Sequence, residues 1–207
     1  FTVITASGVL YTFEALYADS PAQLTVELED WLHRDPYGPF ASRQTYVRLS
    51  ELGDETPLVV NRIMYTIYKR DARHIKTVGS KRFGVQLLLK GIYVQDELFY
   101  FHTSLRNLSN VDYDIDRVRF RIADRKVAKR TAVQETVIEP VCRFNEIAAV
   151  QAGGTVRNVW VFRKFTIPDD KVLIMDVFER NGGRHQSFMV GNTDLVDART
   201  VTDLKVR

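Results

Sequence analysis

The residues with the most evident chemical potential form a basic run, RVRFRIADRKVAKR, at residues 117–130. It holds seven basic side chains and one acid, a local charge of +6, whereas the whole chain carries +3. The rest of the chain is therefore acidic by 3 charges. Such a run can bind nucleic-acid phosphates, bind an acidic protein, or form the solvated face of an edge strand. The candidate partner-binding residues are Arg117, Arg119, Arg121, Arg125, Lys126, Lys129 and Arg130.

Strand geometry separates the first part of this run into two faces, because alternate side chains of a strand point to opposite sides. Single-strand nucleic-acid binders usually carry aromatic residues on the cationic face, and here Phe120 falls on the other one. This disfavours nucleic acid without excluding it. Upstream of Asp116 the apolar residues fall on odd-numbered positions, and downstream of it they fall on even-numbered ones. This change in the alternation predicts a β-bulge near Asp116. The predicted outward residues are Arg117, Arg119 and Arg121, and the inward ones are Val118, Phe120 and Ile122.

No metal site is predicted. The four histidines are scattered, no two of them at HxxxH spacing, and the single cysteine has no CxxC partner. Three aspartates, at positions 112, 114 and 116, alternate as in a calcium loop. An EF-hand loop needs glycine at its sixth position and glutamate at its twelfth, and these positions hold Arg117 and Ala123. The calcium interpretation therefore fails.

No nucleophile or phosphate-binding loop is predicted either. Cys142 lies in EPVCRF, where only Arg143 could lower its pKa, and a small buried side chain is the simpler interpretation. The glycines of AGGTVRN lack the following Lys-Ser/Thr of a phosphate loop. The sequence predicts a binding or assembly module with no cofactor, and not an enzyme.

The elements that position these residues fall into three regions. Residues 1–18 alternate like strands and are predicted to end an N-terminal β region. Residues 19–78 carry two helical patterns and are predicted to form a helical linker, and residues 79–207 a β-sandwich domain. The chain starts at Phe1, so we expect a fragment or a processed chain whose targeting signal is not visible.

The linker is predicted to contain two helices separated by the turn-rich DPYGPF at 35–40. The first follows Ser20-Pro21 and places Leu24, Leu28, Trp31 and Leu32 on one face. The second begins with Thr56 as N-cap and Pro57 in the first turn. Its apolar stripe is predicted from Val59 or Val60, Ile63, Ile67 and Tyr68.

From Gly79 onward the hydrophobic period is two, and short strands recur at about ten-residue spacing. Asn181-Gly182-Gly183 is a strong hairpin signal that predicts a positive φ at one or more positions. The predicted fold is mainly β, an antiparallel, Ig-like β-sandwich. No apolar run approaches the roughly 20 residues of a membrane-spanning helix.

Several long strings resemble one known family. GVQLLLKGIYVQDELFYFHTSLRNLSNVDYDID continues into RVRFRIADRKVAKRTAVQE, and KFTIPDDK, FERNGGRHQSF and LVDARTVTDLKV follow. Together they resemble the TraN proteins of Bacteroides-type conjugative transposons, from about Tyr65 to Arg207. KVAKRTAVQE and NGGRHQSF are the most specific strings, and residues 1–60 match more loosely. A more distant likeness is to the two-sandwich subunit of the outer-membrane core of type IV secretion systems.

The resemblance implies a structural subunit of a conjugative, type IV secretion-like DNA transfer apparatus. It implies a periplasmic or outer-membrane-associated place, with other subunits of the machinery, or further copies of the chain, as partners. Membrane association would be indirect. The competing hypothesis is a nucleic-acid-binding module that uses 117–130. The family defines no functional residue that can be transferred to a position of this chain.

Overall fold

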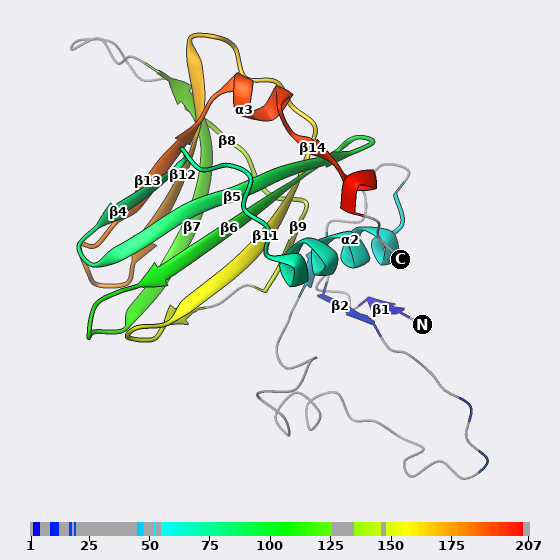
Figure 1. The fold of residues 1–207 in the computed structure, drawn as a ribbon, viewed down its shortest axis with the longest axis horizontal. Coiled ribbons are helices and arrows are strands. Elements are labelled where there is room, and N and C mark those ends of the chain that lie inside the picture. The colour runs from blue at the N-terminus through cyan, green and yellow to red at the C-terminus, as the bar shows by residue number, and fades with distance from the viewer. Residues whose placement is uncertain are drawn as a thin grey trace.

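The structure is a computed structural model that describes residues 2–4, 9–12, 17, 19, 45–47, 52, 55–125, 135–145 and 148–204 (Figure 1). The first predicted helix and the predicted break at 35–40 lie outside these residues. So do three of the candidate basic residues, Lys126, Lys129 and Arg130.

The second predicted helix is confirmed as α2 (Pro57–Arg70). The Thr56 side chain accepts a hydrogen bond from the Val59 amide, and proline occupies the first turn, where its missing N–H costs nothing. The helix ends at Asp71, whose φ of 51° lies in the left-handed region. Its buried face consists of Val60, Ile63, Met64 and Ile67.

Two sheets form an antiparallel β-sandwich, which confirms the predicted mainly β fold. The larger sheet has the strand order β1-β2-β3-β9-β11-β6-β5-β14, with β4 also paired to β5. Only β14 pairs in parallel among the described strands. Its strands are β1 (Thr2–Ile4), β2 (Val9–Thr12), β3 (Thr45–Val47), β4 (Gly79–Arg82), β5 (Val85–Gln95), β6 (Leu98–Asn107), β9 (Cys142–Phe144), β11 (Thr155–Arg163) and β14 (Arg199–Thr200).

The smaller sheet has the order β10-β7-β12-β13, with β8 also paired to β7. Figure 1 shows β5 and β6 in front of this sheet. The described strand order does not confirm the finer, Ig-like assignment. The strands are β7 (Tyr113–Asp124), β8 (Thr136–Val137), β10 (Ala149–Val150), β12 (Lys171–Glu179) and β13 (Gln186–Val190), and they are followed by α3 (Asn192–Val196) and the 3-10 helix η2 (Val201–Leu204).

The main core fills the space between the sheets. Phe120 of β7 packs edge-to-face on two rings of β11, at 5.3 Å from Trp160 and 4.8 Å from Phe162 between ring centroids. The indole N–H of Trp160 donates to Thr103 Oγ1 at 2.9 Å, so its polar atom is satisfied inside the core. The predicted inward face of β7 is thus confirmed: Phe120 is buried, and Val118 and Ile122 are half-buried against this core.

A second core lies on the opposite face of the larger sheet, under α2. The buried face of α2 packs there with Leu98, Tyr100, Val159 and Val161 of the sheet and with Val201 and Leu204 of η2. The helix predicted as part of a linker therefore lies on the sheet as a third layer (Figure 1). The autonomy of residues 79–207 remains a prediction.

The predicted bulge near Asp116 is also present. Phe178 of β12 pairs with Arg117 of β7, but the next residue, Glu179, pairs with Ile115. Asp116 is therefore the extra residue. The bulge moves the apolar phase of β7 by one position, which explains why Tyr113 and Phe120 can both be buried.

Candidate functional site

The basic run begins on the outer face of the smaller sheet. Arg117, Arg119 and Arg121 belong to β7 and point away from the core as predicted, and Arg125 is exposed directly after the strand. Whether this face binds a partner remains a prediction.

Two of these arginines meet carboxylates from other segments. Arg121 Nε donates to Asp176 Oδ2 of β12 at 2.9 Å, and its Nη1 donates to Glu135, just before β8. Arg119 Nη2 donates to the other oxygen of Glu135 at 3.1 Å. The Asp176 side chain is only 4 % exposed, so Arg121 is its main source of charge compensation. These contacts form a fixed ionic network across β8, β7 and β12.

Arg117 of β7 lies at the end of a stack that includes Phe178 of β12 and His185, the residue before β13. Its guanidinium carbon is 4.6 Å from the centroid of the Phe178 ring, and the His185 ring stacks on the same Phe178 at 4.7 Å and 5°. His185 Nε2 also lies 3.2 Å from Asp176 Oδ1, which links the stack to the ionic network. Arg117 is paired with Asp116 at 3.6 Å.

The electrostatics of this face follow from these pairs. Partial burial lowers the pKa of Arg121, but hydrogen bonds and attraction from Asp176 and Glu135 outweigh burial, so the pKa lies above its usual value. A phosphate backbone would have to displace carboxylates already bound to Arg119 and Arg121. The arrangement can therefore recognise a partner through shape and rim charges, and it suits a generic polyanion poorly.

Four residues of this face were not predicted from the sequence: Glu135, Asp176, Phe178 and His185. One signal was available, because Asp176 interrupts the apolar run KVLIMDVFE on the outward phase. A carboxylate there needs a cation on a neighbouring strand, and β7 supplies one. Nothing local indicated that β12 pairs with β7, since a segment of 46 residues separates the two strands.

A second polar cluster lies where α2 ends. The Asp71 carboxylate accepts a hydrogen bond from Lys90 of β5, lies 3.2 Å from Arg157 Nη1 of β11, and is 3.5 Å from His102 Nε2 of β6. The His102 ring is fully buried. Desolvation, followed by repulsion from Lys90, lowers its pKa to about 4, so the ring is neutral at neutral pH. The cluster fastens the end of α2 to three strands.

The remaining chemical candidates serve the fold. The thiol of Cys142 is buried with its Sγ 3.8 Å from Met64 Sδ, and burial raises its pKa far above the usual value. Asp112 Oδ1 accepts a hydrogen bond from the Ala152 amide. In the part of the chain that the structure describes, no three His, Cys, Asp or Glu side chains come together to hold a metal ion. No described helix could cross a membrane.

Comparison with known proteins places the chain in a family. No curated protein matches it. A family model described as a domain of unknown function, DUF4138, matches residues 57–200, from the start of α2 to the end of β14. The matched region contains α2, the described strands of the smaller sheet, the larger sheet apart from β1, β2 and β3, and the contact of Arg121 with Asp176. The chain belongs to the DUF4138 family.

Proposed function

We propose that this protein is a structural subunit of a conjugative, type IV secretion-like DNA transfer apparatus, placed in the periplasm or at the outer membrane. The resemblance of NGGRHQSF and its neighbouring strings to TraN proteins supports the proposal, and NGGRHQSF lies within the family match. Arg184 and His185 of that string hold loops and the outer face of the sandwich, as a scaffold requires.

The paired arginines of β7 are the observation that carries this proposal over its rival. A nucleic-acid-binding surface needs cations that are free to neutralise phosphates, because this releases the counterions condensed on the nucleic acid. Arg119 and Arg121 instead share Glu135, and Arg121 also holds the buried Asp176. Such a network suits a protein partner, because its side chains are already ordered before binding. Association then does not have to order them.

Conjugation itself provides the functional test. We expect deletion of the gene in a donor strain to reduce DNA transfer at least 100-fold, and expression in trans to restore it. A tagged chain should co-purify with the other subunits of the transfer complex. Normal transfer in the deletion strain, or a tagged chain that never enters the complex, would refute the proposal.

DNA binding tests the rival function directly. We expect labelled single-stranded DNA to bind no tighter than the micromolar range typical of non-specific contacts at physiological salt, as measured by fluorescence anisotropy. A nanomolar complex with a steep salt dependence, lost in Arg117→Glu/Arg119→Glu, would favour the nucleic-acid-binding module. Lys81→Glu/Arg82→Glu, which reverses two exposed charges on β4, outside the basic run, is the matched control.

A further inference from the structure

We infer that one end of the sandwich is a docking surface for a partner protein that offers an apolar pocket bordered by carboxylates. The surface, called the tip patch, consists of Phe83, Leu108 and Val111, whose exposed fractions are 63 %, 40 % and 65 %. The inference rests on the proposed function and deepens it, because it names the surface and the chemistry through which the subunit would assemble.

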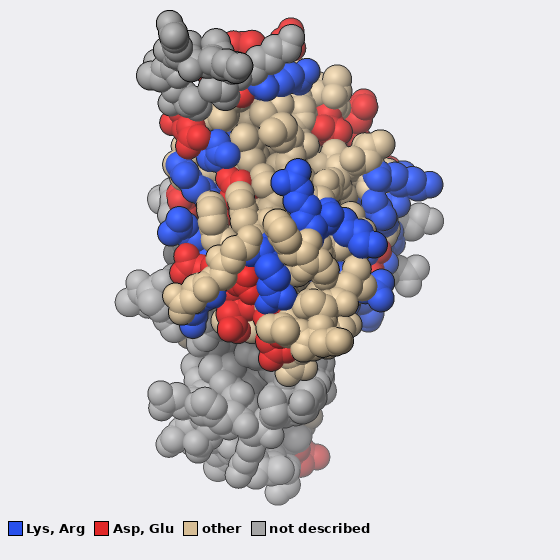
Figure 2. Space-filling model, turned by 90° about the vertical axis from the view of Figure 1, so that its left-hand side faces the viewer, with Lys and Arg blue, Asp and Glu red and all other residues tan. Residues whose placement is uncertain are grey.

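The three side chains come from two loops that touch. The Leu108 amide donates to Gly84 O at 2.6 Å, which ties the β4–β5 turn to the loop between β6 and β7. A Cβ atom on Gly84 would lie 3.1 Å from the Ser109 Cβ, so the two loops pack closely. Figure 1 shows the β4–β5 and β12–β13 turns at the left-hand end of the sandwich, and Figure 2 looks on to that end.

Phe83 occupies a position that folding does not favour for phenylalanine. Its φ is 54° and that of Gly84 is 73°, two consecutive left-handed residues in a two-residue hairpin. Such turns favour Asn-Gly, because asparagine tolerates positive φ and a bulky aromatic residue does not. The ring is also largely exposed to water. A residue that is unfavourable in both conformation and exposure points to a role outside the fold.

The backbone beneath the patch is held rigidly. The buried Asn107 donates from Nδ2 to Val111 O at 2.8 Å and to Val150 O at 3.1 Å. Arg184 donates from Nη1 to Ser109 Oγ at 3.0 Å, and Arg184 is itself fixed by Glu179 through Nε at 2.8 Å. Preorganised apolar side chains bind a matching pocket without an ordering cost. A lipid surface has no shape to match, so the rigid support favours a protein.

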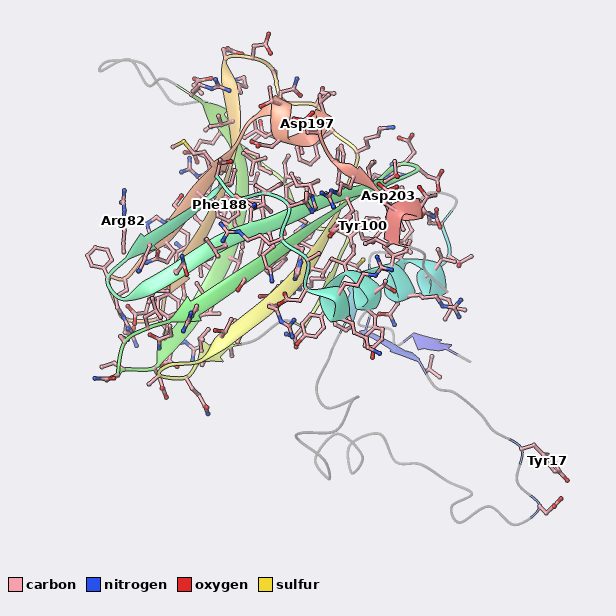
Figure 3. The ribbon with its side chains drawn as sticks, in the orientation of Figure 1. Tyr17, Arg82, Tyr100, Phe188, Asp197 and Asp203 are labelled. Carbon is pink, nitrogen blue, oxygen red and sulfur yellow. The ribbon has the colours of Figure 1, made fainter. Side chains whose placement is uncertain are left out.

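The charges around the patch give the complementary chemistry of the partner. Lys81, Arg82 and Arg106 are exposed, and none of them forms an ion pair within the described part of the chain. Figure 3 shows the Arg82 side chain extending away from β4 into solvent. Figure 2 shows basic side chains beside uncharged surface on this end. Carboxylates at the rim of the partner's pocket would meet these cations.

Site-specific photo-crosslinking in donor cells that carry the whole transfer machinery tests the surface. The probe is p-benzoylphenylalanine, placed at position 83, at position 111, or at Met189 on the outer face of β13 as a similarly exposed control. We expect positions 83 and 111 to form adducts with the same protein, through a segment in which Asp or Glu flanks apolar residues. Position 189 should not reach that segment.

A second variant separates docking from folding. Phe83→Asn suits the turn, so the unfolding midpoint should stay the same or rise, while adducts from position 111 fall at least tenfold. Unchanged adducts in Phe83→Asn, equal adducts from position 189, or adducts only with lipid or a second copy would overturn the inference. So would sedimentation of the wild type, but not Phe83→Asn, with anionic phospholipid vesicles.

The two proposals fail in different ways. If deletion abolishes DNA transfer but positions 83 and 111 form no protein adduct, the docking surface is wrong and the proposed function stands. If both positions join the same acidic segment of a protein outside the transfer machinery, the docking surface stands and the proposed function is wrong.

Discussion

Arg119 and Arg121 are neighbours on the same face of β7, yet their surroundings differ. Arg119 is 40 % exposed and forms an ion pair with Glu135, whereas Arg121 is 20 % exposed and also compensates the buried Asp176. Alternation along the strand predicts the same small effect for both, since both point outward. The structure separates them because a strand partner distant in sequence supplies the second carboxylate.

We therefore predict that Arg121→Glu lowers the free energy of unfolding by about 2–4 kcal/mol. The substitution brings a third carboxylate beside those of Glu135 and Asp176, and it removes the cation that compensates the buried Asp176. Arg119→Glu should cost no more than about 1 kcal/mol. Urea denaturation of the two variants measures the difference. The double variant Arg121→Leu/Asp176→Leu should recover part of the loss. Equal effects of Arg119→Glu and Arg121→Glu would contradict the ionic network.

The β12–β13 turn shows a similar contrast between adjacent glycines. The predicted positive φ is confirmed, but it falls on Asn181, at 52°, and on neither glycine. A Cβ on Gly182 would clash with the Glu179 carboxylate, whereas a Cβ on Gly183 would meet no atom within 4 Å. The sequence predicts that both glycines resist substitution, and the structure assigns this property to Gly182 alone.

Gly182→Ala should therefore cost about 1–3 kcal/mol of unfolding free energy, because Glu179 must leave its hydrogen bonds to Arg184. Gly183→Ala should stay within about 0.5 kcal/mol and is the matched control. Thermal unfolding of both variants provides the comparison. A neutral Gly182→Ala would show that Glu179 can move without loss.

At the scale of elements, α2 closes the outer face of the larger sheet. Its four buried side chains cover Tyr100, Val159 and Val161, and Asp71 fastens its end to Lys90 and Arg157. Residues 79–207 contain both sheets of the family domain but lack α2. Their independent folding, predicted from the change of hydrophobic period, can be tested against a fragment that keeps the helix.

We predict that a 55–207 fragment is more stable than 79–207 by roughly 3 kcal/mol or more, since the side chains of Val60, Ile63, Met64 and Ile67 each gain stability from burial. Both fragments should unfold in a single transition in urea. Equal stabilities would mean that α2 contributes nothing to the core. A 79–207 fragment without a cooperative transition would show that the domain begins at the helix.

Local signals were sufficient for much of the fold. The Thr56-Pro57 start of α2, the alternating burial of β7 and the bulge at Asp116 all follow from residues within a few positions of one another. Strand partners were beyond such signals. The contacts of Arg121 with Asp176 and of Asp71 with Arg157 join segments 55 and 86 residues apart, and no periodicity encodes that pairing.

At the scale of the whole molecule, stability should depend on pH through His102. Its pKa is about 4 in the folded chain and about 6.5 when the chain is unfolded, so the unfolded state binds the proton first as pH falls. Stability is then lost as pH drops from about 6.5 towards 4. Asp71, whose pKa is lowered by Lys90 and Arg157 against the effect of burial, contributes only below this window.

We predict that the protein is about 2 kcal/mol less stable at pH 5 than at pH 7 on account of this ring. The His102→Leu variant should lose most of the difference, because it keeps the volume and removes the titrating group. Urea midpoints of the two proteins at pH 7 and pH 5 provide the measurement. The same pH dependence in His102→Leu would assign the effect to another group.

The position of β14 and η2 has a consequence for synthesis. β14 pairs with β5 across more than 100 residues, and Val201 and Leu204 of η2 complete the core beneath α2. This core is complete only after residue 204 has been synthesised, so α2 and β5 must wait for the strands from β6 to β14 and for η2. Folding that depends on such distant contacts takes milliseconds to seconds. During that interval the nascent chain keeps its apolar helix face open to chaperones.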